Sequence, residues 1–150
     1  MVVKSKDISN KILNQVIELV LVGEQITHAQ LKENLLKSEY IAYILEDGIV
    51  KTTATLKNPL DSYRKRVYRE SKSNKSANDQ RELGYIATHK DFEGEGYCSR
   101  LLEEFKFSFE DQSLFATTRK KSMIHILKKY DFKITGEAYK LDLNLMINHG

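Results

Sequence analysis

HKDFEGEGYCSRLL, at residues 89–102, is the stretch of this 150-residue sequence that most restricts its fold. It follows a strand-like run, contains Gly94 and Gly96, and passes into the amphipathic pattern of a helix. The first N–H groups of a helix have no intrahelical partner, and the helix dipole adds partial positive charge there. Because glycine lacks a Cβ and readily adopts positive φ, an anion can approach such a turn closely. The pattern predicts a phosphate-binding turn, with a purely structural bend as the alternative.

Two common nucleotide-binding motifs do not fit this stretch. A dinucleotide-binding motif needs a third glycine where Ser99 stands, and it follows the first strand of its fold. A P-loop needs lysine and then serine or threonine after its second glycine, where this chain has Tyr97 and Cys98. The turn therefore belongs to another kind of fold.

The rest of the sequence gives an order of elements on both sides of this turn. Asp47-Gly48 is a strong hairpin signal between two runs rich in β-branched residues. The expected helices cover residues 8–22, 27–38, 96–109 and 122–130, and the expected strands cover 40–46, 49–57, 82–89, 114–118, 133–139 and 140–147. This order predicts an α/β (α+β) fold with a mixed, mostly antiparallel sheet of six to seven strands and about four helices.

Length and composition favour one domain over residues 1–150. The chain has 41% hydrophobic and 30% charged residues and a net charge of +3, values typical of an ordinary globular protein. A single cysteine excludes a disulfide framework and favours a reducing compartment. No apolar run approaches the roughly 20 residues that span a bilayer. We expect a cytoplasmic protein without a membrane partner, either a monomer or a homodimer.

One segment stands apart in composition. Residues 58–80 contain the only proline, two tyrosines and six basic residues, namely Arg64, Lys65, Arg66, Arg69, Lys72 and Lys75. We expect a basic, mobile loop with at most one helical turn, which is either simply solvated or holds an acidic or phosphorylated acceptor, or RNA.

The element order and the run ELGYIATHKDFEGEGYCSRLLEEF at residues 82–105 resemble the GNAT family of acyl-CoA-dependent N-acyltransferases. The resemblance implies a single GNAT-like domain that transfers an acetyl group from acetyl-CoA to a primary amine. The acceptor, a small molecule or a protein, stays unidentified. In this family the segment corresponding to residues 58–80 commonly forms part of the acceptor site.

The resemblance also implies which residues bind acetyl-CoA. The main-chain N–H groups that would bind the pyrophosphate are those of Phe92, Glu93, Gly94, Glu95, Gly96 and Tyr97. Those that would bind the pantetheine arm and polarise the thioester are in Ile86, Ala87 and Thr88. Glu93 and Glu95 stand where the family commonly has basic residues, so repulsion should weaken phosphate binding somewhat.

Two residues are candidates for acid–base catalysis. Glu82, at the start of its strand, corresponds to a carboxylate that removes the amine proton in similar enzymes, and an exposed strand-start glutamate is the alternative. Tyr130 is the candidate general acid, with Tyr139 as the second choice. Cys98, in the first turn of its helix, is either a nucleophile or a packing residue. The histidines lack metal-ligand spacing, so we expect no metal.

Two other functions stay open at this stage. The acidic loop would also suit a GNAT-fold binding module that has lost catalysis. A basic RNA-binding module acting through residues 61–80 is less favoured, and it would use Arg64, Lys65 and Arg66.

Overall fold

A computed structural model describes residues 1–78 and 80–148. Asp79, in the predicted basic loop, and His149, among the histidines considered as metal ligands, lie outside the described residues. The helices are α1 (Asn10–Leu21), α2 (His28–Lys37), α3 (Asp61–Glu70), α4 (Tyr97–Ser108) and α5 (Lys121–Lys129), with short 3₁₀ turns at Ser5–Asp7 and Lys90–Phe92. The strands are β1 (Val2–Lys4), β2 (Tyr40–Glu46), β3 (Ile49–Lys57), β4 (Arg81–Thr88), β5 (Leu114–Thr118), β6 (Lys133–Tyr139) and β7 (Leu143–Asn148).

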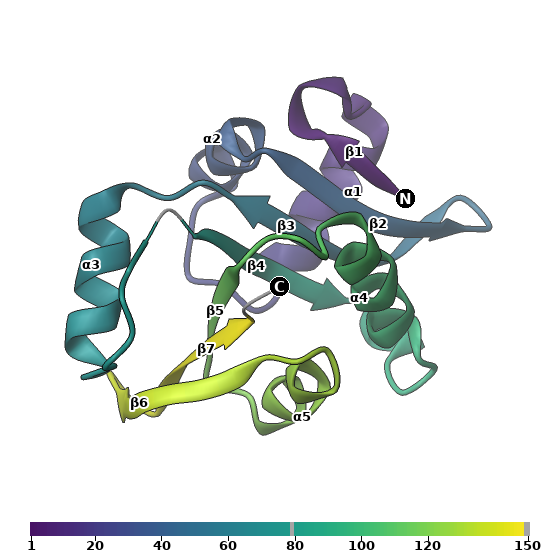
Figure 1. The fold of residues 1–150 in the computed structure, drawn as a ribbon. Helices are drawn as coiled ribbons and strands as arrows, with labels where there is room; N and C mark the ends of the chain where they lie inside the picture. The colour runs from purple at the N-terminus through teal and green to yellow at the C-terminus, as the bar shows by residue number, and fades with distance from the viewer. Residues whose placement is uncertain (79, 149–150) are drawn as a thin grey trace. The chain divides into compact units, whose positions relative to one another are not determined.

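The seven strands form one mixed sheet in the order β1-β2-β3-β4-β5-β7-β6 (Figure 1). The pairing of β4 with β5 is parallel, whereas β1–β2, β2–β3, β5–β7 and β6–β7 are antiparallel. The predicted fold class is therefore confirmed. Contacts divide the chain into two compact units: unit 1 comprises residues 1–57 and 84–108, and unit 2 comprises 58–83 and 109–150. The single-domain assignment stays a prediction, and β4 contributes residues to both units.

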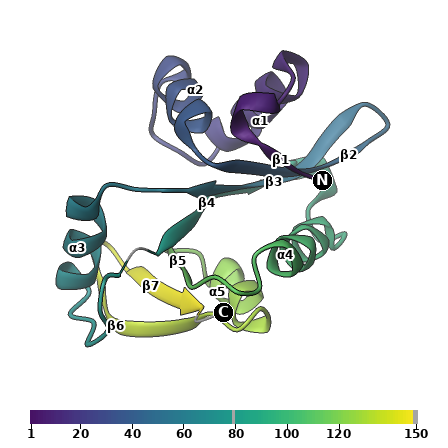
Figure 2. The same ribbon diagram turned by 45° about the horizontal axis from the view of Figure 1, so that its top comes forward.

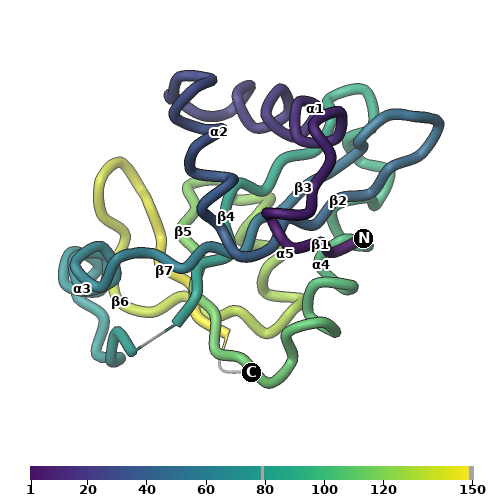
Figure 3. The backbone as a smooth tube through the Cα atoms, turned by 90° about the horizontal axis from the view of Figure 1, so that it is seen from above, coloured from purple at the N-terminus to yellow at the C-terminus, as the bar shows by residue number. Residues whose placement is uncertain are grey.

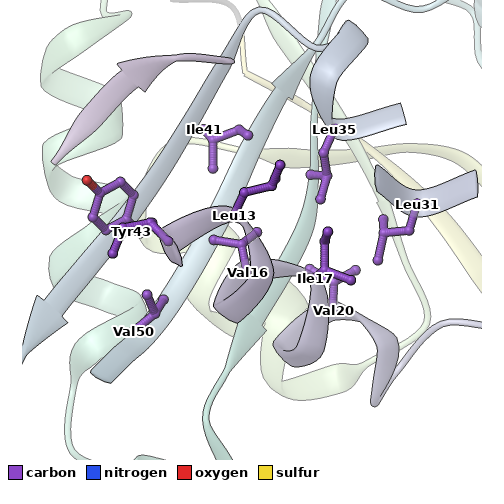
Figure 4. Close-up of a cluster of buried hydrophobic side chains, with 10 residues drawn as sticks. Leu13, Val16, Ile17, Val20, Leu31, Leu35, Ile41, Tyr43 and Val50 are labelled. Atoms are coloured by element: carbon purple, nitrogen blue, oxygen red, sulfur yellow. The ribbon is translucent and has the colours of Figure 1, made fainter. Parts of the chain in front are cut away.

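Unit 1 is built around a core of aliphatic side chains from α1, α2 and the β2–β3 hairpin. Ser9 caps α1 by accepting a hydrogen bond from the Ile12 N–H at 3.3 Å, and Thr27 caps α2 in the same way. The two helices lie side by side (Figures 2 and 3), and their buried faces meet the hairpin (Figure 4). The core residues are Ile12, Leu13, Val16, Ile17, Val20, Leu31, Leu35, Ile41, Tyr43 and Val50. Helix α4 lies on the other face of these strands (Figure 2).

The hairpin forms as predicted around Asp47 and Gly48, whose φ angles of 53° and 74° are those a tight two-residue turn requires. Strand β1 was not predicted. It has only three residues, too few for a periodic pattern, and it pairs with β2.

Unit 2 contains α3, α5 and the antiparallel strands β5, β7 and β6. The loop prediction for residues 58–80 is wrong over Asp61–Glu70, which form the ten-residue helix α3 in place of a single turn. Val67 and Tyr68 bury one side of this helix against Phe115, Leu145 and Ile147. This buried stripe was difficult to recognise in the sequence, because charged residues occupy the remaining faces of the helix.

The C-terminal end of α3 is joined to β6 by close main-chain contact. Glu137 donates its N–H to the Ser71 carbonyl at 2.6 Å, and the hydroxyls of Ser73 and Thr135 lie 2.7 Å apart. Gly136 has a φ of 70°, and a Cβ there would collide with the Ser71 carbonyl oxygen. Only glycine allows this approach.

Among the described residues, no helix is long and apolar enough to cross a membrane.

Candidate active site

Strand β4 contains a main-chain irregularity between its two predicted functional segments. Tyr85 has a φ of 48°, which a non-glycine residue in a strand rarely adopts. Its hydroxyl accepts a hydrogen bond from the Asn34 side-chain amide at 3.1 Å, and the Lys57 ammonium lies 3.9 Å from the centre of its ring. A left-handed residue interrupts the regular alternation of a strand and redirects the main-chain groups that follow it. The groups redirected here belong to Ile86, Ala87 and Thr88.

The glycine turn has the geometry that close approach of a ligand requires. Gly94 and Gly96 have φ angles of 79° and 84°. Apart from the glycine itself and its two chain neighbours, no heavy atom of the described residues lies within 4 Å of where a Cβ would stand at either position, so the space above both is open. Helix α4 begins at Tyr97, directly after Gly96. The Glu93–Tyr97 segment can therefore present its N–H groups to an anion.

Phe92 has a different role from the one predicted. Its N–H donates to the His89 carbonyl at 2.9 Å, so this group is used within the chain. The ring is held on one face by the Lys51 ammonium, 3.2 Å from the ring centre. The rings of His89 and Tyr97 pack against it with centroid separations of 5.1 and 6.1 Å. Phe92 anchors the turn, and we remove it from the predicted pyrophosphate donors.

Positive charge lies close to the turn although the turn's own side chains are acidic. Lys51, only 4% exposed, places its ammonium against Phe92. Glu46 accepts a hydrogen bond from the Tyr97 hydroxyl at 2.7 Å and pairs with Arg100 at 3.5 Å. The hydrogen bond from Tyr97 is the main reason that the pKa of Glu46 is lowered. Glu93 and Glu95 are both exposed, where solvent and salt screen their charges.

Cys98 is a packing residue. It is buried, and burial raises the pKa of its thiol to about 11. A thiolate is the reactive form of cysteine, and little of it exists at neutral pH with such a pKa. The nucleophile alternative is therefore not supported.

Glu82 lies in unit 2 and, contrary to the exposed alternative, is only 4% exposed. It pairs in register with Phe115 of β5. Its Oε2 accepts a hydrogen bond from the Tyr63 hydroxyl at 3.0 Å. Burial, and then the nearby Glu82 carboxylate, raise the pKa of Tyr63 far above its usual value, so Tyr63 stays a donor at every physiological pH.

Tyr63 is the hydrogen-bond partner of Glu82 that sequence reasoning did not identify. It lies on α3, in the segment expected to be a loop, and 19 positions separate it from Glu82. The sequence did contain a signal for a helix with one buried face. Tyr63 and Val67 are four residues apart, and so are Arg64 and Tyr68. All four side chains lie on the inner side of α3, half-buried at Tyr63 and buried at the other three.

Tyr139 also lies in the electrostatic surroundings of Glu82. Burial raises the pKa of its hydroxyl, the carboxylates of Glu70 and Glu82 raise it further, and Arg119 and Arg66 oppose them. Tyr130 ends α5, and its carbonyl accepts a hydrogen bond from the Asn148 side chain at 2.7 Å. That contact involves its main chain only, so the acid role of Tyr130 stays a prediction.

Arg64 is part of the internal structure of unit 2. It is buried, and its guanidinium donates to the Gln80 carbonyl at 2.9 Å and to Asp61 at 2.7 Å. The RNA-binding alternative assigned this residue to an exposed basic surface. That assignment is wrong, because exposing the guanidinium would break both contacts.

Within residues 1–78 and 80–148, no group of three or more His, Cys, Asp and Glu side chains could hold a metal ion.

Several solved structures with the same fold are distant from this chain in sequence. A GNAT-family acetyltransferase from Streptococcus agalactiae superposes with a TM-score of 0.74 at 15% identity, covering 99% of this chain and 94% of that one. An acyl-CoA N-acyltransferase from Pseudomonas aeruginosa gives 0.72 at 14%, covering 99% and 97%. The ribosomal-protein-S18-alanine N-acetyltransferase from Escherichia coli gives 0.66 at 13%, covering 99% and 92%. No family model and no curated protein matches the sequence. The chain has the GNAT fold.

Proposed function

We propose that this protein is an N-acetyltransferase that moves the acetyl group of acetyl-CoA to a primary amine. The observation that carries the proposal is the buried carboxylate of Glu82, which accepts a hydrogen bond from Tyr63 of α3. Glu82 belongs to β4, the strand that also contains Ile86–Thr88. The same kind of fold occurs in acyl-CoA N-acyltransferases of known structure. A buried carboxylate held by a protonated donor is an arrangement typical of acid–base catalysis.

Unit 1 would bind acetyl-CoA. The N–H groups of the Glu93–Tyr97 segment would bind the pyrophosphate, helped by the dipole of α4. Open space at Gly94 and Gly96 supports this role. The main-chain groups of Ile86, Ala87 and Thr88 would pair with the extended pantetheine arm, as an added strand pairs with a sheet edge. One N–H of this segment would also stabilise the oxyanion that forms on the thioester carbonyl.

Unit 2 would prepare the amine. An ammonium group cannot attack a thioester, so Glu82 takes one of its protons. The free amine then forms the new C–N bond, its nitrogen loses a second proton to solvent, and the C–S bond breaks as the tetrahedral intermediate collapses. The departing thiolate of CoA takes up a proton, for which Tyr139 and Tyr130 are the candidate donors. Tyr63 holds the Glu82 carboxylate in place through its hydrogen bond.

Two measurements on the unmodified chain test this proposal. Isothermal titration compares acetyl-CoA with acetylated pantetheine, which has the thioester arm but no pyrophosphate. We expect micromolar binding of acetyl-CoA and at least about tenfold weaker binding of the shorter ligand, because most of the anion contacts are lost. Release of free CoA thiol is then followed with a panel of primary amines.

The outcomes separate the proposal from its rival. Binding together with amine-dependent thiol release supports the transferase. Binding of acetyl-CoA without release for any amine would favour the module that has lost catalysis. If acetyl-CoA does not bind at millimolar concentration, the proposed function is wrong.

A further inference from the structure

Charged side chains of unit 2 lie near Tyr63, whose hydroxyl donates to the Glu82 carboxylate, and near Tyr139. Arg66, on the outer side of α3, lies with its guanidinium 5.5 Å from the ring centre of Tyr63. Arg119 follows β5 and donates from Nε and Nη2 to the Lys140 carbonyl at 3.2 and 3.0 Å. Both arginines contribute positive potential at Tyr139, where Glu70 and Glu82 contribute negative potential. The cluster therefore contains both signs of charge close together.

The turn that holds Arg119 is strained. Lys140, Leu141 and Asp142 have consecutive φ angles of 42°, 57° and 66°, and none of them is glycine. Residues other than glycine rarely adopt these angles, so the turn persists only because neighbouring contacts fix it. Arg119 supplies two of these contacts, and the Lys140 ammonium pairs with Glu70 at 3.3 Å. The same contacts fix the guanidinium of Arg119 and the position of Tyr139 beside it.

We propose that the acceptor is a small amine that carries an anionic group, a carboxylate or a phosphate, which Arg66 and Arg119 bind while Glu82 takes the ammonium proton. This inference rests on the proposed function and specifies its acceptor. The guanidinium presents several N–H donors in one plane and binds carboxylate and phosphate oxygens in pairs. Arg66 lies near the ring of Tyr63, the hydrogen-bond donor to Glu82, and Arg119 contacts the carbonyl of the residue after Tyr139. Two positive side chains and a buried carboxylate in one unit match the two opposite charges of such an amine. An amine without the anionic group would interact only with Glu82 and with neither arginine.

The test compares matched amines that differ only in the anionic group. One pair is phenylalanine and phenethylamine, and the other is phosphoethanolamine and ethanolamine. The chain, Arg66→Gln and Arg119→Gln are assayed for CoA thiol release at constant ionic strength. Lys65→Gln is the matched control, because Lys65 is an exposed base on the same helix with no role in the cluster. Binding of each amine without acetyl-CoA is measured in parallel by chemical-shift titration.

We expect kcat/KM to be at least tenfold higher for the anionic member of one pair. That preference should fall at least tenfold in both arginine variants and persist in Lys65→Gln. The pair that shows the preference distinguishes a carboxylate from a phosphate. Equal kcat/KM within both pairs, or a preference that survives in the arginine variants, would overturn the inference while leaving the transferase intact.

The titration of each amine without acetyl-CoA tests the inference independently of catalysis. If no amine is acetylated but the anionic amines still bind in a way that both arginine variants weaken, the proposed function fails and the inference about ligand charge holds. If the anionic amines show no preferential binding either, both proposals are wrong.

Discussion

The glycine turn of unit 1 and the Glu82 cluster of unit 2 differ in which part of each residue is proposed to act. At the turn, the groups proposed to act are main-chain N–H groups, and the side chains of Glu93 and Glu95 are exposed. At the cluster, the acting groups are side chains, with Glu82 buried and Tyr63 half-buried. Main-chain chemistry depends on φ angles and open space, whereas side-chain chemistry depends on the particular functional group.

This difference predicts different responses to substitution. A conservative change of side chain should leave the turn nearly unaffected and should inactivate the cluster. A change that alters only main-chain freedom should do the reverse. Substitutions in the two regions should therefore separate acetyl-CoA binding from turnover.

The largest effect is expected for Glu82→Gln. Glutamine has the same size and its carbonyl oxygen can still accept the Tyr63 hydrogen bond, but it cannot take a proton from the amine. We expect kcat to fall by about 10²–10⁴, the usual contribution of general acid–base catalysis. The acetyl-CoA dissociation constant should stay within about twofold, measured by titration. A loss of less than threefold in kcat would remove Glu82 from the mechanism.

The next largest effect is expected for Gly96→Val, which should raise the acetyl-CoA dissociation constant at least about tenfold. Valine is strained at a φ of 84° by on the order of 1–2 kcal/mol, and its side chain would fill the open space. The matched control is Gly48→Val, since Gly48 has a φ of 74° and equally open surroundings in the β2–β3 turn. Equal weakening in both variants would show a general loss of folding in place of a lost phosphate contact.

Tyr63→Phe should have an intermediate effect, reducing kcat about tenfold with the acetyl-CoA dissociation constant unchanged. The hydroxyl that holds Glu82 is lost, and a hydrogen bond to a charged group typically contributes about 1.5–3 kcal/mol. Thermal unfolding and kcat are measured together.

Tyr68→Phe is the control for that variant. It removes a buried hydroxyl on the same helix. That hydroxyl donates to the Gln80 side chain and does not contact Glu82 through this bond. It should lower the melting temperature and leave kcat within about twofold at a temperature where the variant is folded. An equal loss of kcat in both variants would mean that α3 acts only through stability.

The two regions also differ in how far the sequence could predict them. Helix α4 was predicted because Leu101, Leu102 and Phe105 recur at helical spacing, and all three are buried. The turn before it could be predicted because its glycines are adjacent to that helix in sequence. Local patterns are sufficient where the acting groups belong to consecutive residues.

The Glu82 cluster could be predicted only in part, because its members come from separate elements. Glu82 was found through a family resemblance. Its partner Tyr63 was missed, since their contact depends on how α3 packs on β5 and β7, with Val67 against Phe115 and Leu145. A buried arginine such as Arg64 adds to the difficulty, because its charge in the sequence indicates exposure. Packing across elements decides which polar residues are inside.

The smallest effect is expected for Glu93→Gln and Glu95→Gln, the variants that test the acidic turn directly. Exposed charges act weakly on a bound anion, so each change should tighten acetyl-CoA binding by less than about fivefold at low salt. The difference should disappear near 1 M salt, where the screening length is about 3 Å. Glu24→Gln, an equal charge change in the segment between α1 and α2, is the control and should have no effect. If binding weakens in the turn variants, the carboxylates themselves take part in binding, and the main-chain account of the turn is wrong.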